Sequence, residues 1–284
     1  MTARRTLFVA VLALAVPGVA GGAAGDRHHS QVARTPALSA NFSYVETGGQ
    51  LPHHYKDGRV TIVRADGRRF AFSLRPLRPG YDVAPTFAGP DEKAIHIRRL
   101  DKQGDPEVVV DLYWGGAHCC FYTVVFRYDP AAKTYLRASH LWGDTPPRLR
   151  ELGSDGRVEF VSGDDRFAYA FTSFADSAFP VQVWTFADGR FVDATRSFPA
   201  LIRASAKRHL AEYRSEQRSD RSVRGILAAY LAERYLLGEA DGGWAVVHRA
   251  AARGELAHTY DGSDTAATYL HRLRAFLARN GYSR

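Results

Sequence analysis

The side chains best suited to chemistry stand together in one short stretch. His118 precedes Cys119 and Cys120, which are the only cysteines of the 284-residue chain. A histidine beside a thiol can lower the pKa of the thiol and so create a nucleophile. Neighbours in sequence do not, however, present the opposed geometry of a catalytic pair, and the chain has no Gly-x-Ser-x-Gly motif. A hydrolase or thiol-redox enzyme that uses His118 with Cys119 or Cys120 is therefore the alternative hypothesis.

The two cysteines can also react with each other. Cα atoms joined by a trans peptide lie about 3.8 Å apart, whereas ordinary disulfides span about 4.4 to 6.8 Å. A Cys119–Cys120 bridge therefore needs a turn-like peptide, and the flexible Gly115 and Gly116 before the pair allow one. A regular strand would instead direct the two thiols to opposite faces. We predict a structural vicinal disulfide. Free thiols with one of them buried, and metal binding or catalysis, are the alternatives.

Acidic and aromatic side chains provide further candidates for binding. Asp164 and Asp165 form an adjacent acidic pair, and Asp111 and Trp114 stand just before the cysteine-containing turn. Paired carboxylates can perform acid–base chemistry, but an acidic pair at a turn also serves simply to end a strand. We take Trp114, Asp111, Asp164 and Asp165 as candidate ligand-binding residues and assign a catalytic role to none of them.

One stretch resembles a known group of proteins. Residues 101–110 read Asp-Lys-Gln-Gly-Asp-Pro-Glu-Val-Val-Val, and residues 115–120 read Gly-Gly-Ala-His-Cys-Cys. This succession resembles the integrin-like or propeller-type repeats (the FG-GAP and VCBS classes) of exported bacterial proteins, in which a loop rich in aspartate and glycine leads into Pro-Glu and a buried strand. The Gly-Gly-x-His-Cys-Cys element is similar to one in uncharacterised exported proteins. The resemblance implies an extracellular β-repeat module with a binding or structural role.

The same resemblance implies a calcium site, because the loop of these repeats often binds calcium through alternating aspartates. Asp101, Asp105 and Glu107 could supply oxygen ligands. Lys102 and Gln103 depart from the pattern, since acidic or glycine residues are expected there. Calcium needs about six to eight oxygen ligands, and a cation within the loop opposes its binding. We therefore predict no cofactor and keep calcium as the alternative.

The elements that must position these residues follow a β-type pattern from Gly58 onward. Apolar residues at alternate positions predict short antiparallel strands, and turns rich in Asp, Gly and Pro separate them. The expected strands cover residues 60–62, 70–74, 94–98, 108–113, 121–128, 135–140, 158–161, 167–171, 181–186 and 191–192. Residues 124–136 resemble residues 182–192, which suggests blade-like repeated units. A partial propeller and a sandwich both remain open.

The apolar period changes to that of a helix near Ser197. A stripe at i, i+3, i+4, i+7 and i+8 predicts one helix that Gly238 ends; it consists of Val223, Ile226, Leu227, Tyr230 and Leu231. Further helices are expected over 199–213, 244–252 and 265–279, with Ser197 as a cap and Pro199 in the first turn. Amphipathic helices joined by short loops are typical of a small bundle.

The beginning of the chain indicates export. Arg4 and Arg5 precede an apolar run over 7–16 and a small, turn-prone segment, which together predict a secretory signal peptide at residues 1–24. The run is too short to cross a membrane, and no second apolar run follows, so we expect no transmembrane span in the mature chain. The expected location is secreted or extracellular, or periplasmic if the cell has an outer membrane. Export by the general or the twin-arginine route stays open.

The net charge bears on partners. The formal charge of +8 suits attraction to an anionic cell-envelope surface, and it equally suits an ordinary basic surface. The chain has no basic motif interleaved with aromatic residues and no zinc-ligand spacing, so we expect no nucleic-acid partner.

These observations combine into one prediction. We expect an α+β protein with an N-terminal antiparallel all-β domain, partly propeller-like or a sandwich, followed by a small C-terminal helical bundle. The expected divisions are a signal peptide at 1–24, an irregular lead-in at 25–57, the β domain at 58–195 and the helical domain at 196–284. The expected role is an exported, non-enzymatic binding or interaction module with a structural cysteine pair.

Overall fold

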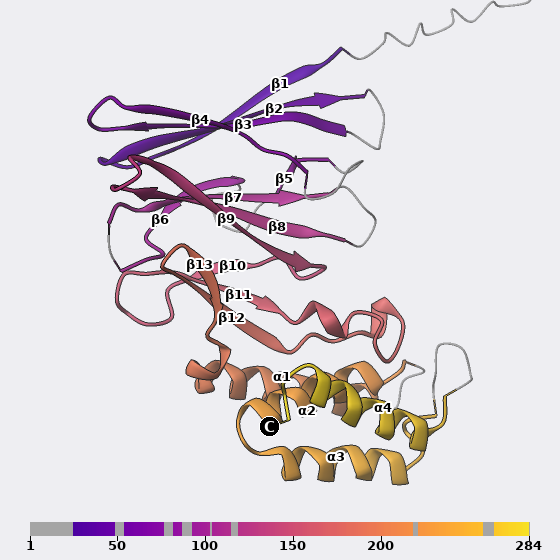
Figure 1. The fold of residues 1–284 in the computed structure, drawn as a ribbon. Coiled ribbons are helices and arrows are strands. Elements are labelled where there is room, and N and C mark those ends of the chain that lie inside the picture. Colours follow the sequence, from indigo (N-terminus) through magenta and orange to yellow (C-terminus); the bar gives the residue numbers. More distant parts are fainter. Residues whose placement is uncertain are drawn as a thin grey trace, which may run out of the picture.

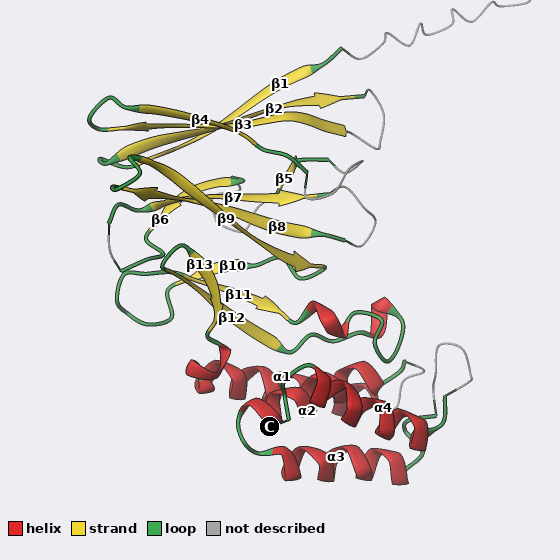
Figure 2. Cartoon of the chain, in the orientation of Figure 1, coloured by secondary structure: helices red, strands yellow, loops and turns green. Residues whose placement is uncertain are grey.

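The chain divides into a β part and a helical part. The computed structural model describes residues 25–48, 54–76, 82–86, 93–102, 104–114, 119–217, 221–257 and 264–283; the predicted signal peptide at 1–24 lies outside these residues. Figure 1 shows the sheets stacked one above another with the helices in a layer at one end, and Figure 2 shows the same separation by type of element. The predicted α+β architecture, antiparallel sheets followed by helices, is confirmed.

The first sheet is a meander that pairs in chain order. Within the described residues its strands are β1 (Arg27–Arg34), β2 (Leu38–Thr47), β3 (His54–Arg64) and β4 (Arg69–Ser73). Leu38, Ala40 and Phe42 are buried at alternate positions of β2, as in a strand with one face on the core. The prediction of an irregular lead-in over 25–57 is therefore wrong for β1 and β2. A β3–β4 hairpin alone would be only marginally stable, and these two strands complete its sheet.

The second sheet lies between two hydrophobic cores. Its strands are β5 (Ala84–Pro85), β6 (Ile95–Arg98), β7 (Glu107–Tyr113), β8 (Phe121–Asp129) and β9 (Thr134–Gly143). Val108 and Val110 of β7 pack in the core shared with the first sheet. Val109 packs on the opposite side with Phe160 and Phe186 of the third sheet. Because both faces of β7 are covered, Val108, Val109 and Val110 are apolar in succession rather than at alternate positions.

The third sheet is again an antiparallel meander. Its strands are β10 (Arg148–Arg150), β11 (Glu159–Gly163), β12 (Val181–Ala187) and β13 (Arg190–Asp193). The two segments of similar sequence, 124–136 and 182–192, lie in the hairpins β8–β9 and β12–β13. The strand predicted at 167–171 is wrong, because this segment begins at the last residue of the short 3-10 helix η1 (Asp165–Phe167) and continues as turns. Phe167 and Phe171 are apolar because they pack in the core of the helical part.

The helices form where the sequence predicts them. They are α1 (Pro199–Glu216), α2 (Arg224–Leu236), α3 (Ala240–Ala252) and α4 (Ala266–Arg279). Leu227, Ala228 and Leu231 of α2 are fully buried, so α2 is the central helix of the layer. Pro199 occupies the first turn of α1 as expected, but Ser197 does not cap it: Ser197 ends the 3-10 helix η3 (Thr195–Ser197). In the described part of the chain, no helix combines the length and the apolar character needed to cross a membrane.

A buried carboxylate joins the two parts. Glu233 of α2 is fully buried, and its Oε1 accepts a hydrogen bond from the backbone nitrogen of Val181 in β12 at 3.1 Å. Its Oε2 lies 2.9 Å from Nδ1 of His209 in α1. A buried carboxylate is tolerated only when it is paired in this way. The contact, like the packing of Phe167 and Phe171 among the helices, fixes the third sheet against the helical layer.

Candidate functional site

A cavity of about 690 Å³ lies where the third sheet meets the helical layer. It is lined by the ends of β9 and β12, the turn that follows β11, the segment after β13 and the last described residues of the chain. These segments are far apart in sequence, so only folding creates the cavity. The side chains that bear on its chemistry are His140, Trp142, Asp164, Asp165, Arg166, Trp184, Asp193, Arg196 and Tyr282.

An uncharged aromatic surface forms one side of the cavity. The His140 ring centroid lies 4.2 Å from that of Trp142 and 4.2 Å from that of Trp184. Phe191 stands 5.1 Å away. Burial lowers the pKa of His140 to about 4, and the charge of Asp193 opposes this shift only in part. At neutral pH the imidazole is therefore neutral and extends the tryptophan surface.

Asp164 holds the end of the chain against the sheet. The side chain is 2% exposed, and it caps η1 by accepting a hydrogen bond from the backbone nitrogen of Arg166 at 3.1 Å. The Arg166 guanidinium donates to both carboxylate oxygens, at 2.8 Å and 2.5 Å. The Tyr282 hydroxyl donates to Oδ2 at 2.6 Å. Asp164 thus lies at the cavity, but its oxygens are already engaged by the protein.

Asp165 is more accessible to a ligand. Its Oδ1 accepts a hydrogen bond from the backbone nitrogen of Asp144 at 2.6 Å, and none of the described residues donates to its Oδ2. The carboxylate covers Gly143, where φ is +64° and an added Cβ would come within 1.9 Å of the Asp165 carboxyl carbon. Only glycine suits that position. Burial raises the pKa of Asp165, and the charge of Asp164 adds to the effect against the bond from Asp144.

The segment after β13 provides a second acid and a second arginine. Asp193 Oδ1 accepts hydrogen bonds from the backbone nitrogen and the hydroxyl of Thr195, at 2.9 Å and 2.6 Å. Arg196 donates to the carbonyl oxygen of Leu236 at 3.1 Å and reaches the carbonyl oxygens of residues 281 and 282. The arginine therefore ties α2 and residues 281 and 282 to this segment, while none of the described residues donates to Asp193 Oδ2.

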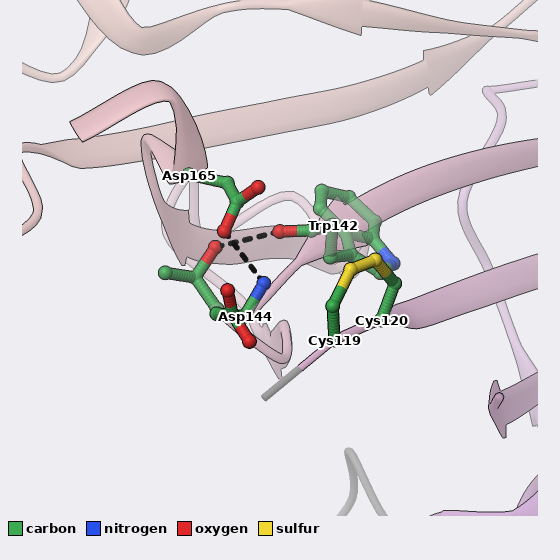
Figure 3. The surroundings of a disulfide bond; sticks show 6 residues. Cys119, Cys120, Trp142, Asp144 and Asp165 are labelled. Atoms are coloured by element: carbon green, nitrogen blue, oxygen red, sulfur yellow. Dashed lines mark hydrogen bonds between the residues drawn. A yellow bond between two sulfur atoms is a disulfide. The ribbon is translucent and has the colours of Figure 1, made fainter. Parts of the chain in front are cut away.

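The cysteine pair lies near this cavity. Figure 3 draws Cys119 and Cys120 as a disulfide, with Trp142, Asp144 and Asp165 in its surroundings. The peptide between the cysteines is cis and their Cα atoms are 3.0 Å apart, closer than the about 3.8 Å of a trans peptide. Cys120 is 5% exposed, and its carbonyl oxygen accepts a hydrogen bond from the backbone nitrogen of Trp114 at 3.2 Å. His118 and the glycines before it lie outside the described residues.

Asp111 and Trp114 belong to the core of the β part. Asp111 is 1% exposed, and its Oδ1 accepts a hydrogen bond of 2.5 Å from Thr123, which accepts one of 2.8 Å from the Trp142 indole. His96 Nε2 lies 3.6 Å from Asp111 Oδ2. Burial raises the pKa of Asp111 to about 7, although the bond from Thr123 opposes the shift. Neither Asp111 nor Trp114 lines the cavity; the chain of bonds from Asp111 instead supports Trp142.

The calcium candidates face different partners. Asp101 Oδ2 lies 3.1 Å from Nε of Arg127, and Asp105 Oδ2 lies 2.5 Å from Arg64. Glu107 is 1% exposed and accepts a hydrogen bond from the backbone nitrogen of residue 100 at 2.9 Å. Burial raises the pKa of Glu107, against the backbone bonds that it accepts. Two of the three carboxylates thus pair with arginines, and in the described part of the chain no group of three acidic, histidine or cysteine side chains could hold a metal ion.

Sequence reasoning identified only part of the cavity. Asp164 and Asp165 were among the candidates, but His140, Trp142, Trp184 and Asp193 were not. One signal was available: His140 ends a predicted strand at 135–140 and Trp142 follows two residues later, so the two share a face once the strand extends to Gly143 as β9 does. The sequence does not say, however, which other strand that face packs against.

The helical part of the chain is similar to a known protein family. The family described as the sll0997 C-terminal domain matches residues 202–281, which span α1 to α4. No solved structure matches the chain.

Two curated proteins are similar to a longer stretch. The "Probable thylakoid lumen protein sll0997" of Synechocystis sp. is 34% identical over 154 residues, which cover 53% of this chain and 45% of that protein. The "Uncharacterized protein y4bJ" of Sinorhizobium fredii is 29% identical over 157 residues, which cover 54% of this chain and 24% of that protein. The chain thus spans less than half the length of either relative.

Proposed function

We propose that this chain is an exported, non-enzymatic binding module and that the cavity between the third sheet and the helices is its ligand site. One observation carries the proposal: the cavity combines an aromatic surface around Trp184 with the carboxylates of Asp165 and Asp193 in a volume of about 690 Å³. Ligand sites in proteins typically occupy about 300 to 1,000 Å³ and join apolar surface to a few polar groups.

Two independent features support export. The segment at 1–24 has the charged start and apolar run of a signal peptide. One relative is described as a probable thylakoid lumen protein, which is a location outside the cytoplasm. The cell-envelope partner suggested by the net charge of +8 remains part of the proposal, and attraction to an anionic surface is the mechanism it would use.

The cysteine pair has a structural role in this proposal. We infer that Cys119 and Cys120 form a vicinal disulfide in the oxidising compartment to which the chain is exported. The strand register pairs Phe121 with Gly143. The two cysteines, which directly precede Phe121, therefore lie next to the end of β9, where Asp144 follows. A closed ring there would hold the start of β8 beside Trp142, at the edge of the cavity.

The meander sheets also support the proposed kinship with FG-GAP and VCBS repeats. Each sheet pairs its strands largely in chain order, as the blades of repeat proteins do. In this interpretation the β part is a set of blade-like units, and the helical part closes one end and completes the cavity.

A ligand screen tests the proposal. Thermal unfolding of the mature chain is followed against small molecules and short peptides, and a true ligand raises the melting temperature by binding only the folded state. The shift should disappear in Trp184→Ala and persist in Leu136→Ala, which removes an exposed apolar side chain outside the cavity. Shifts that are identical in the two variants would place the binding elsewhere and refute the assignment of the site.

A further inference from the structure

The charged side chains around the cavity differ in how many of their hydrogen-bonding atoms remain available to a ligand. Among the described lining residues, the arginines are already used by the protein. Arg166 donates through Nε and Nη2 to Asp164, and through Nη1 to the backbone and side-chain oxygens of Asn280 at 3.2 Å. Arg196 donates to backbone carbonyl oxygens of α2 and of the end of the chain. Their hydrogen-bonding capacity holds the walls together.

The protein engages the oxygens of two lining carboxylates less completely than it engages the arginines. Asp165 and Asp193 each employ Oδ1 on backbone or hydroxyl donors, and no described residue donates to the Oδ2 of either. Both carboxylates line the cavity. A ligand therefore meets hydrogen-bond acceptors with negative charge, and the matching ligand group is a donor with positive charge.

The aromatic surface favours the same kind of ligand. His140, Trp142 and Trp184 form a continuous set of rings with centroids 4.2 Å apart at each step. Trp142 is 3% exposed and backs the other two rings, so Trp184 offers the indole face to a ligand, and such a face attracts guanidinium and ammonium groups through its quadrupole. The low pKa of His140 keeps the imidazole uncharged at neutral pH, so the surface does not repel a cation.

The local charge reverses that of the whole chain. The lining arginines and aspartates contribute 2 − 3 = −1, whereas the formal net charge of the chain is +8. A cavity of this sign on a basic protein concentrates cations at one place. Its volume of about 690 Å³ exceeds what a bare ammonium needs, so the ligand also carries an apolar stem that covers the rings.

We propose that the cavity binds an organic cation, namely a guanidinium or ammonium group on an apolar stem, with the cation at the carboxylates that line the cavity, Asp165 and Asp193, and the stem against Trp184. This inference rests on the proposed function and deepens it by naming the ligand class. The side chains of basic peptides and the polyamines both carry this chemistry.

Isothermal titration calorimetry of the mature chain tests the ligand class. The probes are N-acetyl-arginine amide, spermidine and N-acetyl-citrulline amide, in which a neutral urea of similar shape replaces the guanidinium. We expect the arginine probe, spermidine or both to bind, and the citrulline probe to bind about tenfold more weakly or worse, as loss of a charge-assisted hydrogen bond implies. Preference between the arginine probe and spermidine distinguishes peptide from polyamine.

Matched variants assign the effect to the two acids. Asp165→Asn and Asp193→Asn keep the Oδ1 acceptor for Asp144 and Thr195 and remove the charge. Each should weaken the cationic probe about tenfold. Asp241→Asn, an exposed acid at the start of α3 outside the cavity, should leave binding unchanged. Circular dichroism confirms that each variant is folded.

The outcomes separate the ligand class from the proposed function. Equal binding of the citrulline and arginine probes overturns the cation proposal and leaves the ligand site. A second outcome also overturns the cation proposal and leaves the ligand site: a neutral sugar such as N-acetylglucosamine binds, Trp184→Ala abolishes that binding, and no cationic probe binds. If no probe or screened compound binds in a way that the cavity variants weaken, the proposed function fails together with the cation proposal.

Discussion

The Tyr282 hydroxyl donates a hydrogen bond of 2.6 Å to Oδ2 of Asp164. The two residues are 118 positions apart, and they are 4% and 2% exposed. Asp164 begins the turn after β11, and Tyr282 follows α4, so this bond connects the third sheet to the end of the helical layer. Both side chains line the cavity, and the bond therefore helps to shape the site.

Removing this bond should destabilise the junction. Tyr282→Phe keeps the ring and leaves Asp164 paired with Arg166, so we expect a loss of about 1 to 3 kcal/mol in the free energy of unfolding. Urea denaturation followed by circular dichroism measures it. The control Tyr169→Phe alters a hydroxyl on a tyrosine that is 57% exposed and should have little effect. Equal stability of wild type and Tyr282→Phe would show that water replaces the hydroxyl.

Glu233 should be the most sensitive position between the two parts. Glu233→Ala leaves His209 and the backbone nitrogen of Val181 buried without their partner, so we expect a loss of about 3 to 5 kcal/mol. Glu239→Ala is the matched control, because Glu239 pairs with Arg234 at 2.7 Å on the surface, where its side chain is 36% exposed. Exposed ion pairs contribute about 0 to 1 kcal/mol. Similar losses in both variants would contradict the joining role of Glu233.

His140 should make stability depend on pH in acid. Its pKa is about 4 in the folded chain, below the usual value of 6.5. Between these values the unfolded chain binds a proton that the folded chain does not, so stability falls as pH drops from about 6.5 to about 4. The free energy of unfolding can change by at most about 1.4 kcal/mol per pH unit for one proton. We expect a smaller change because the ring is only partly buried. Denaturation at several pH values should show a shallower dependence in His140→Phe, and parallel curves would refute this assignment.

Asp111 should act in the opposite direction. Its pKa is about 7 in the folded chain, above the usual value of 3.8. The folded chain then retains a proton that the unfolded chain has lost, so this contribution to stability is complete below about pH 4 and disappears as pH rises through about 7. Asp111→Asn keeps the acceptor for Thr123 without the titration. Its stability relative to wild type should increase from pH 4 to pH 7; a constant difference would mean that His96 pairs with an ionised Asp111.

The cysteine pair can be tested by mass spectrometry of the purified chain. We expect no alkylation without reductant and two added labels after reduction, because a vicinal disulfide leaves no free thiol until it is reduced. A Cys119→Ser and Cys120→Ser double variant, which cannot be labelled, controls for reaction at other residues. Labelling of unreduced protein would establish free thiols and bring the thiol-enzyme alternative with His118 back into consideration.

Local patterns were sufficient for much of the fold. The helical stripe from Val223 to Leu231 predicted α2, and the Asp66-Gly67 turn predicted the β3–β4 hairpin, because helix and hairpin formation depend on neighbours in sequence. The same reasoning failed at 167–171, where Phe167 and Phe171 are apolar for contact with helices. It also missed β1, whose polar, histidine-containing sequence resembles a linker until a partner strand is present, and β2, although Leu38, Ala40 and Phe42 alternate there as in a strand.

The sequence alone determined the division into strands and then helices, most of these elements in their order, and the unusual adjacency of Cys119 and Cys120. It also singled out Asp164 and Asp165, but it could not distinguish the engaged acid from the accessible one. Only the tertiary structure decided that, because Tyr282 and Arg166 approach Asp164 while Asp165 turns to the backbone of Asp144. The same holds for the cavity itself. Its aromatic and acidic sides come from strands and turns that long-range packing brings together, and no local periodicity encodes which faces meet.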